Sequence, residues 1–198
     1  QAIEDLGDKV TCLVCHRGHG AQHGDLLRLD PDRNQLCLSC HAEMQPELMG
    51  DGVQTAHGRL PTLSPPQVAV AAQFAARIGT DNVLLCATCH KTHGARTNEF
   101  LLAFDPAQHD TCADCHVDRQ SVIGSSHDLR TDHPEVVNVI GVTPTQGGAC
   151  SGCHTAHRAA RVPQPSALDP AGQCTMCHVA GGLAADATLG AVNHPFDK

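Results

Sequence analysis

The chain has 198 residues, with twelve cysteines and fifteen histidines but no tryptophan, no tyrosine and only four phenylalanines. Its formal net charge is −8, and an acidic balance argues against a nucleic-acid partner. No apolar run is long enough to span a bilayer, so no membrane span is expected. So few aromatic side chains cannot supply an ordinary hydrophobic core. Another apolar group must therefore take their place.

A five-residue pattern, Cys-x-x-Cys-His, occurs six times and uses every cysteine. The two thiols of this pattern can form thioethers with a porphyrin, and the adjacent imidazole reaches the iron as proximal ligand. We therefore predict six c-type haems. The expected attachment residues are Cys12, Cys15, Cys37, Cys40, Cys86, Cys89, Cys112, Cys115, Cys150, Cys153, Cys174 and Cys177, and the proximal ligands are His16, His41, His90, His116, His154 and His178.

Paired cysteines can also bind zinc or form disulfides. The spacing between successive pairs is close to that of a zinc ribbon, and twelve is an even number of cysteines. Neither alternative requires a histidine directly after the second cysteine, yet all six copies have one. The histidines therefore favour haem.

The small number of residues available for each haem predicts the fold class. Six haems would share 198 residues, which is too little chain for six independent cores. We expect mostly coil with short α-helices wrapped around a stacked-haem core, with little or no β-sheet. Haem removal should then unfold the chain.

Along the chain, the six motifs fall into three pairs. Within each pair the two first cysteines follow at a nearly constant interval, from Cys12 to Cys37, from Cys86 to Cys112 and from Cys150 to Cys174, whereas the intervals between pairs are longer and irregular. Each pair forms one doubled haem unit, called a repeat below. We expect a single haem-cored domain over residues 1–198, with repeats at 12–57, 86–133 and 150–194 and connectors at 58–85 and 134–149.

Short helices are predicted to carry the second motif of each repeat. An Asp-Pro pair precedes each of these motifs, and the prolines are Pro31, Pro106 and Pro170. Asp is a favourable N-cap and Pro suits the first helical position, so we expect the helices to begin at these prolines. A simple turn is the alternative. A further helix is predicted over 67–78, with Val70, Phe74 and Ile78 packed inward. Residues 135–149 are expected to form an irregular arm.

Nine histidines remain after the six proximal ones, and six of them recur in register. One set lies three residues past the first proximal histidine of each repeat, and the other follows the second proximal histidine at a nearly constant interval. We predict that these six are the distal ligands: His19, His93, His157, His57, His133 and His194. His23, His109 and His127 do not recur and are interpreted as non-ligands, although the choice of His133 over the nearby His127 stays open.

Methionine is the alternative axial ligand, but Met44 and Met49 do not recur and Met176 lies inside a motif. Methionine raises haem potentials, so bis-histidine ligation predicts lower potentials and low-spin iron. Residues three apart on a helical turn point to the same side, so His19 cannot ligate the haem held by His16. We expect it to ligate a neighbouring haem, an arrangement that brings two porphyrins close together.

Residues 12–41, 86–116 and 150–178 resemble the doubled Cys-x-x-Cys-His family of multihaem c-type cytochromes. The family unit reads Cys-x-x-Cys-His-x-x-His-Gly, then a Leu-rich spacer and Leu-Cys-x-x-Cys-His. Leu36 keeps the last spacer residue, whereas Thr111 and Gln173 do not. The resemblance implies a multihaem cytochrome c that transfers electrons. The family includes periplasmic shuttles, subunits of outer-membrane conduits and extracellular filaments called nanowires.

In relatives of this family, a His-Pro pair commonly precedes the next doubled unit, as His133-Pro134 precedes Cys150. If each such histidine serves the following repeat, His194 has no following repeat in its own chain and the first repeat has no upstream donor. A head-to-tail homopolymer, in which His194 ligates a haem of the neighbouring subunit, would satisfy both. We therefore expect an extracellular or cell-surface nanowire subunit. The alternative is a monomeric periplasmic shuttle.

No enzymatic activity and no catalytic residue are expected. Multihaem enzymes expose an iron with an open position, whereas every motif here ends in histidine and the distal histidines exceed the number required. A multihaem oxidoreductase is kept as the less favoured alternative. The expected partners are redox proteins or extracellular acceptors. Covalent haem attachment implies assembly outside the cytoplasm, and a start at Gln1 without a signal-peptide pattern is typical of a mature exported product.

Overall fold

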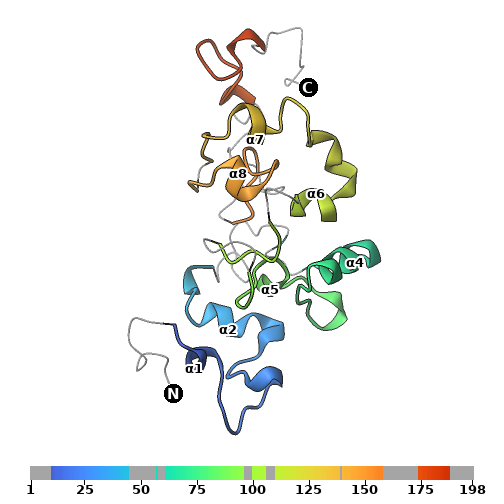
Figure 1. Ribbon diagram of the computed structural model, residues 1–198, viewed down its shortest axis with the longest axis vertical. Helices are drawn as coiled ribbons and strands as arrows, with labels where there is room; N and C mark the ends of the chain where they lie inside the picture. The colour runs from blue at the N-terminus through green and yellow to red at the C-terminus, as the bar shows by residue number, and fades with distance from the viewer. Residues whose placement is uncertain are drawn as a thin grey trace. The chain divides into compact units, whose positions relative to one another are not determined.

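The computed structural model describes residues 10–44, 57, 61–95, 100–105, 110–138, 140–157 and 174–187. Within these ranges the chain consists of coil and short helices, and it contains isolated β-bridges but no strands (Figure 1). The predicted fold class, coil with short helices and little or no sheet, is confirmed in this respect. The stacked-haem core stays a prediction.

Most of the helices are single turns. The α-helices are α1 (Cys12–Cys15), α2 (Gln35–Leu38), α4 (Pro65–Gln73), α5 (Cys86–Cys89), α6 (Thr111–Cys115), α7 (Leu129–Asp132) and α8 (Pro144–Gly147). The 3-10 helices are η2 (Gly24–Leu26), η3 (Pro31–Arg33), η4 (Ala42–Met44), η5 (Thr80–Asn82), η6 (Val117–Val122) and η7 (Ala185–Ala187).

Two compact units make up the chain. The first unit comprises Gln1–Pro46 and Leu60–Phe104, and the second comprises Glu47–Arg59 and Asp105–Lys198. The first unit includes α1, α2, α4 and α5, drawn in blue to green in Figure 1, and the second includes α6, α7 and α8. Each unit holds three haem motifs, so the boundary falls inside the second repeat. The predicted single haem-cored domain stays a prediction.

The first unit has a small apolar interior. Its buried hydrophobic side chains are Val14, Leu27, Leu63, Ala71, Leu85, Ala103 and Phe104. The ring of Phe74 meets Phe104 edge to face, with centroids 6.2 Å apart. Such a pair adds to the hydrophobic contact, and it fixes the end of α4 against the segment that leads out of the third motif.

Helix α4 starts earlier and ends earlier than the predicted range 67–78. At its start, Pro65 takes the first helical position and the side chain of Gln67 accepts a hydrogen bond from the Ser64 amide at 2.9 Å. At its end, Ala75 adopts a positive φ of 50°, which interrupts the helical hydrogen bonds. The predicted range was therefore wrong at both ends, because the capping residues lie before the Ala-rich stretch. Ala71 is the buried residue of α4, whereas Val70, Phe74 and Ile78 are half-buried.

The Asp-Pro signal predicts the start of a turn but not of the motif-bearing helix. Asp30 accepts a hydrogen bond from the Asp32 amide at 2.9 Å, and η3 begins at Pro31. Asn34 then adopts a left-handed conformation, and α2 starts only after it. In the second repeat the helix that carries the motif begins at Thr111, not at a proline. Pro106 and Pro170 lie outside the described residues.

The second unit has a polar interior. Its buried polar residues are Asp110, Asp128, Asn138, Ser151 and Thr155, and its buried hydrophobic residues among those described are Ala113 and Ala149. The side chain of Asn138 organises much of the predicted irregular arm. Its oxygen Oδ1 accepts from the backbone amides of Ile140 and Val142 at 3.0 Å, and its Nδ2 donates to the Ser151 carbonyl at 2.9 Å. The arm also contains α8, which the sequence did not predict. Thr143 and Gln146 cap its start.

Candidate haem sites

All six Cys-x-x-Cys-His motifs form the same closed turn. In each, the histidine amide donates to the carbonyl of the first cysteine, at 2.9 Å in the first, second, third and fifth motifs, 2.7 Å in the fourth and 3.0 Å in the sixth. This bond holds the two thiols and the imidazole on one short segment. The turn is thus present in the third repeat as well as in the first two.

The proximal histidines of the first and third motifs have fixed ring orientations. Nδ1 of His16 lies 2.8 Å from the Asp25 carbonyl, and Nδ1 of His90 lies 2.8 Å from the Phe100 carbonyl. A carbonyl can only accept, so Nδ1 carries the proton and Nε2 keeps its lone pair for a metal. Isolated antiparallel bridges from His16 to Leu27 and from His90 to Leu102 hold the returning segments in place.

Three pairs of histidine rings face one another, and each pair joins a proximal histidine to a histidine from another repeat. The pairs are His16 with His93, His57 with His116, and His127 with His178, and in each the ring centroids are 6.0 Å apart. The interplanar angles are 38°, 26° and 53° respectively. The His16 pair lies within the first unit and the other two lie within the second.

This spacing fits iron between two imidazoles. A ligating nitrogen lies about 2 Å from its metal, so two rings on opposite sides of one iron have centres about 6 Å apart. His57 is also suited to ligation, because burial, followed by the nearby His116 and His157, lowers the pKa of His57. A lowered pKa keeps the imidazole neutral, which is the form that binds a metal.

None of the twelve cysteines forms a disulfide, so their thiols can attach haem. Two pairs of first cysteines meet at the junctions between repeats: the side chain of Cys37 hydrogen-bonds to Cys86, and that of Cys112 to Cys150. The bond from Cys86 lowers the pKa of Cys37 to about 7, while the pKa of Cys86 is raised. The bond from Cys112 likewise lowers the pKa of Cys150. A lowered pKa favours the reactive thiolate.

Large apolar side chains next to the motifs are exposed. Leu13 lies inside the first motif and is 56% exposed, and Val117, directly after His116, is 62% exposed. Met176 lies inside the sixth motif and is 49% exposed. A porphyrin face is apolar, so a bound haem could cover these exposed side chains. They therefore fit the predicted cofactor, in addition to the thiols and imidazoles.

The remaining predicted ligands are placed as follows. His19 is exposed, and His133 lies 3.8 Å from the Glu135 carboxylate. His41 is exposed and lies 3.4 Å from Glu43. His154 and His157 are both exposed. His194 lies outside the described residues, as does His109.

His127, which the recurring spacing predicts to be a non-ligand, faces a proximal histidine. Its ring, and not that of His133, faces His178. The interval from His116 to His127 is shorter than the interval from His41 to His57, so a search for recurring spacing favours His133. The η6 turns shorten the path after the fourth motif and bring His127 into position. The ligand roles of both histidines stay predictions.

Residues 6–46 and 79–121 match the profile of the family described as the doubled CXXCH motif. The chain carries doubled CXXCH motifs. The two matched segments contain the first four motifs, and the predicted resemblance to multihaem c-type cytochromes is confirmed there. Doubled CXXCH motifs imply covalently bound c-type haem and a role in electron transfer. No curated protein and no solved structure matches the chain significantly. Among the described residues, no helix is long and apolar enough to cross a membrane.

Proposed function

We propose that the chain is a hexahaem cytochrome that passes electrons along six bis-histidine haems. The supporting observation is the set of three facing histidine pairs, each of which joins two repeats. The haems, when bound, supply reversible one-electron chemistry at iron. The cysteines anchor them, the proximal and distal imidazoles close both faces of each iron, and no open position is left for a substrate.

Ligation between repeats is what makes the sites useful for electron transfer. A distal histidine from one repeat must lie next to a haem of another, so the two haems it connects are held close together. The polypeptide contributes the spacing, the ring orientation and the local electrostatics, and it performs no bond chemistry on a substrate. The proposed partners are redox proteins or extracellular acceptors.

Two of the three pairs also follow a register that supports a filament. His57 follows the second motif and faces the fourth, and His127 follows the fourth motif and faces the sixth. Each histidine thus serves the second motif of the following repeat. By the same register, His194 would serve the second motif of the first repeat in another copy, whose proximal histidine is His41. The side chain of His41 is exposed and contacts Glu43.

We therefore propose a head-to-tail filament in which His194 completes the site of His41 in the next subunit. Such a contact uses two different surfaces and need not close into a ring, so it generates a filament. The proposed location is extracellular or at the cell surface. A monomeric periplasmic shuttle, with His194 folded back on its own chain, is the alternative.

Electron microscopy of the purified holoprotein tests this proposal. Wild type should form long filaments, and His194→Ala should give discrete particles with one iron per chain converted from low spin to high spin. His23→Ala is the matched control and should still form filaments. Intact His194→Ala filaments with all irons low spin would rule out the shared ligand. A high-spin signal in the oxidised wild type would instead favour an enzyme.

A further inference from the structure

Two buried polar residues occupy equivalent places at the junctions between repeats. Asn34 is the N-cap residue of α2 and Asp110 is the N-cap residue of α6, so each precedes the first cysteine of a second motif. The side chain of each also accepts a hydrogen bond from a backbone amide at, or directly before, the first cysteine of the next repeat. The two residues have nearly the same size, but only Asp110 carries a charge.

At the junction in the first unit, the side-chain oxygen Oδ1 of Asn34 accepts from the Cys86 amide at 3.0 Å. Asn34 is 2% exposed, and among the described residues its Nδ2 atom has no hydrogen-bond partner. Cys37 and Cys86, which hydrogen-bond to each other, lie beside it. The haems held by these two cysteines would thus share a buried but neutral neighbour.

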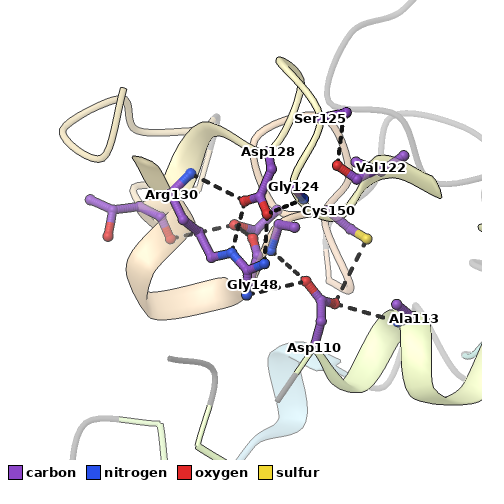
Figure 2. Close-up of polar contacts among 12 residues, drawn as sticks. Asp110, Ala113, Val122, Gly124, Ser125, Asp128, Arg130, Gly148 and Cys150 are labelled. Carbon is purple, nitrogen blue, oxygen red and sulfur yellow. Dashed lines mark hydrogen bonds and ion pairs between the residues drawn. The ribbon is translucent and has the colours of Figure 1, made fainter. Parts of the chain in front are cut away.

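At the junction in the second unit, the Asp110 side chain is 2% exposed. Its carboxylate accepts from the amides of Ala149 at 2.6 Å and Ala113 at 3.4 Å, and from the Cys150 thiol at 3.8 Å (Figure 2). The carboxylate oxygen and the thiols of Cys112 and Cys150 all lie within 4.8 Å of one another. A buried anion is therefore in contact with the anchoring sulfurs of two haems.

Arg130 is shared between two carboxylates and lies closer to Asp128 than to Asp110. Its guanidinium makes two short hydrogen bonds to Asp128, at 2.8 and 2.7 Å, and is 3.9 Å from Asp110. The carboxylate of Asp128 is also buried, with 6% of its side chain exposed. The cluster of Asp110, Asp128 and Arg130 thus holds two anions and one cation, as Figure 2 shows.

We infer that Asp110 is a potential-tuning residue that makes the two haems held by Cys112 and Cys150 harder to reduce than the two held by Cys37 and Cys86. An oxidised haem iron carries one more positive charge than a reduced one. A buried carboxylate nearby stabilises the oxidised form, and the low local dielectric strengthens this effect. The inference rests on haem attachment as proposed above but not on filament formation. Of the two junctions, electrons would then reside preferentially at that of Asn34.

The chain offers a reciprocal pair of variants for the test. Asp110→Asn removes the charge and keeps one of the two accepting oxygens, and Asn34→Asp installs the charge at the other junction. In a spectroelectrochemical titration of the holoprotein, Asp110→Asn should move two of the six reduction steps to higher potential. Asn34→Asp should move two steps to lower potential. Asp132→Asn, which removes an exposed carboxylate of the second unit, should leave all six steps in place.

Haem content is measured on every variant by mass spectrometry, so that loss of haem is distinguished from a change in potential. Variants with the wild-type haem number but unchanged potentials would overturn the inference and leave the proposed function intact. A wild-type chain without haem would instead overturn the proposed function. If Asp110→Asn does not fold, Asn34→Asp decides the question alone: a shift to lower potential supports the inference and no shift overturns it.

Discussion

The imidazole rings of His57 and His116 face one another with centroids 6.0 Å apart and an interplanar angle of 26°, although the two histidines are far apart in the sequence. His116 belongs to the fourth motif, and His57 follows the second. The last histidine of the first repeat is thus brought to a site of the second repeat. The proposed bis-histidine ligation across repeats would use this contact.

We predict that His57→Ala removes the distal ligand of the haem held by His116 and no other. One of the six irons should then change from low spin to high spin in the oxidised protein, because the open position takes only a weak ligand. Electron paramagnetic resonance measures this change. His23→Ala removes a half-buried histidine that is not a predicted ligand, and its spectrum should match wild type. A His57→Ala spectrum that is entirely low spin would contradict the pairing.

A second prediction separates His127 from His133. His127 faces His178 at 6.0 Å, whereas His133 lies 3.8 Å from the Glu135 carboxylate. From this geometry, His127→Ala should produce one high-spin iron and His133→Ala none. The two variants change the same residue type six positions apart, so each is the control for the other. The opposite result would restore the choice favoured by the sequence spacing.

Local chemistry was readable from the sequence, whereas connections between repeats were not. The attachment cysteines and the proximal histidines follow directly from Cys-x-x-Cys-His, because all of them lie within one short segment. The identity of the histidine that faces His178 depends on how η6 shortens the chain after His116, and no spacing rule contains that information. The roles of Asn34 and Asp110 were missed for a similar reason: their partners, Cys86 and Ala149, lie 52 and 39 residues away.

A third prediction concerns the number of haems. The turn at Cys174 closes with the same hydrogen bond as the other five, at 3.0 Å, although the sixth motif lies outside the segments that match the family profile. The intact mass of the holoprotein should therefore exceed that of the polypeptide by six haems. Replacing both Cys174 and Cys177 by alanine should reduce the excess to five. The same replacement at Cys12 and Cys15, in a matched segment, should also leave five, and a wild-type excess of four would contradict the assignment of the third repeat.

The last prediction concerns acid stability. Hydrogen bonds from Arg130, aided by the amide of Gly124 and opposed by burial, lower the pKa of Asp128 from 3.8 to about 2. A carboxyl whose pKa is lower in the folded state than in the unfolded state stabilises the fold above the unfolded value, and this stability is lost as the pH falls through the folded value. At neutral pH the ionised Asp128 should thus contribute about 2 kcal/mol to the free energy of unfolding.

Asp128→Asn should therefore lower the free energy of unfolding at pH 7, and the difference from wild type should shrink as the pH falls from about 4 to about 2. Denaturant titrations of the holoprotein at a series of pH values, followed by far-ultraviolet circular dichroism, measure both quantities. Asp118→Asn is the control, because the Asp118 carboxylate is 67% exposed and pairs with the exposed Arg119. A destabilisation by Asp128→Asn that is independent of pH would mean that the charge on Asp128 contributes nothing and that only its hydrogen-bond acceptors matter.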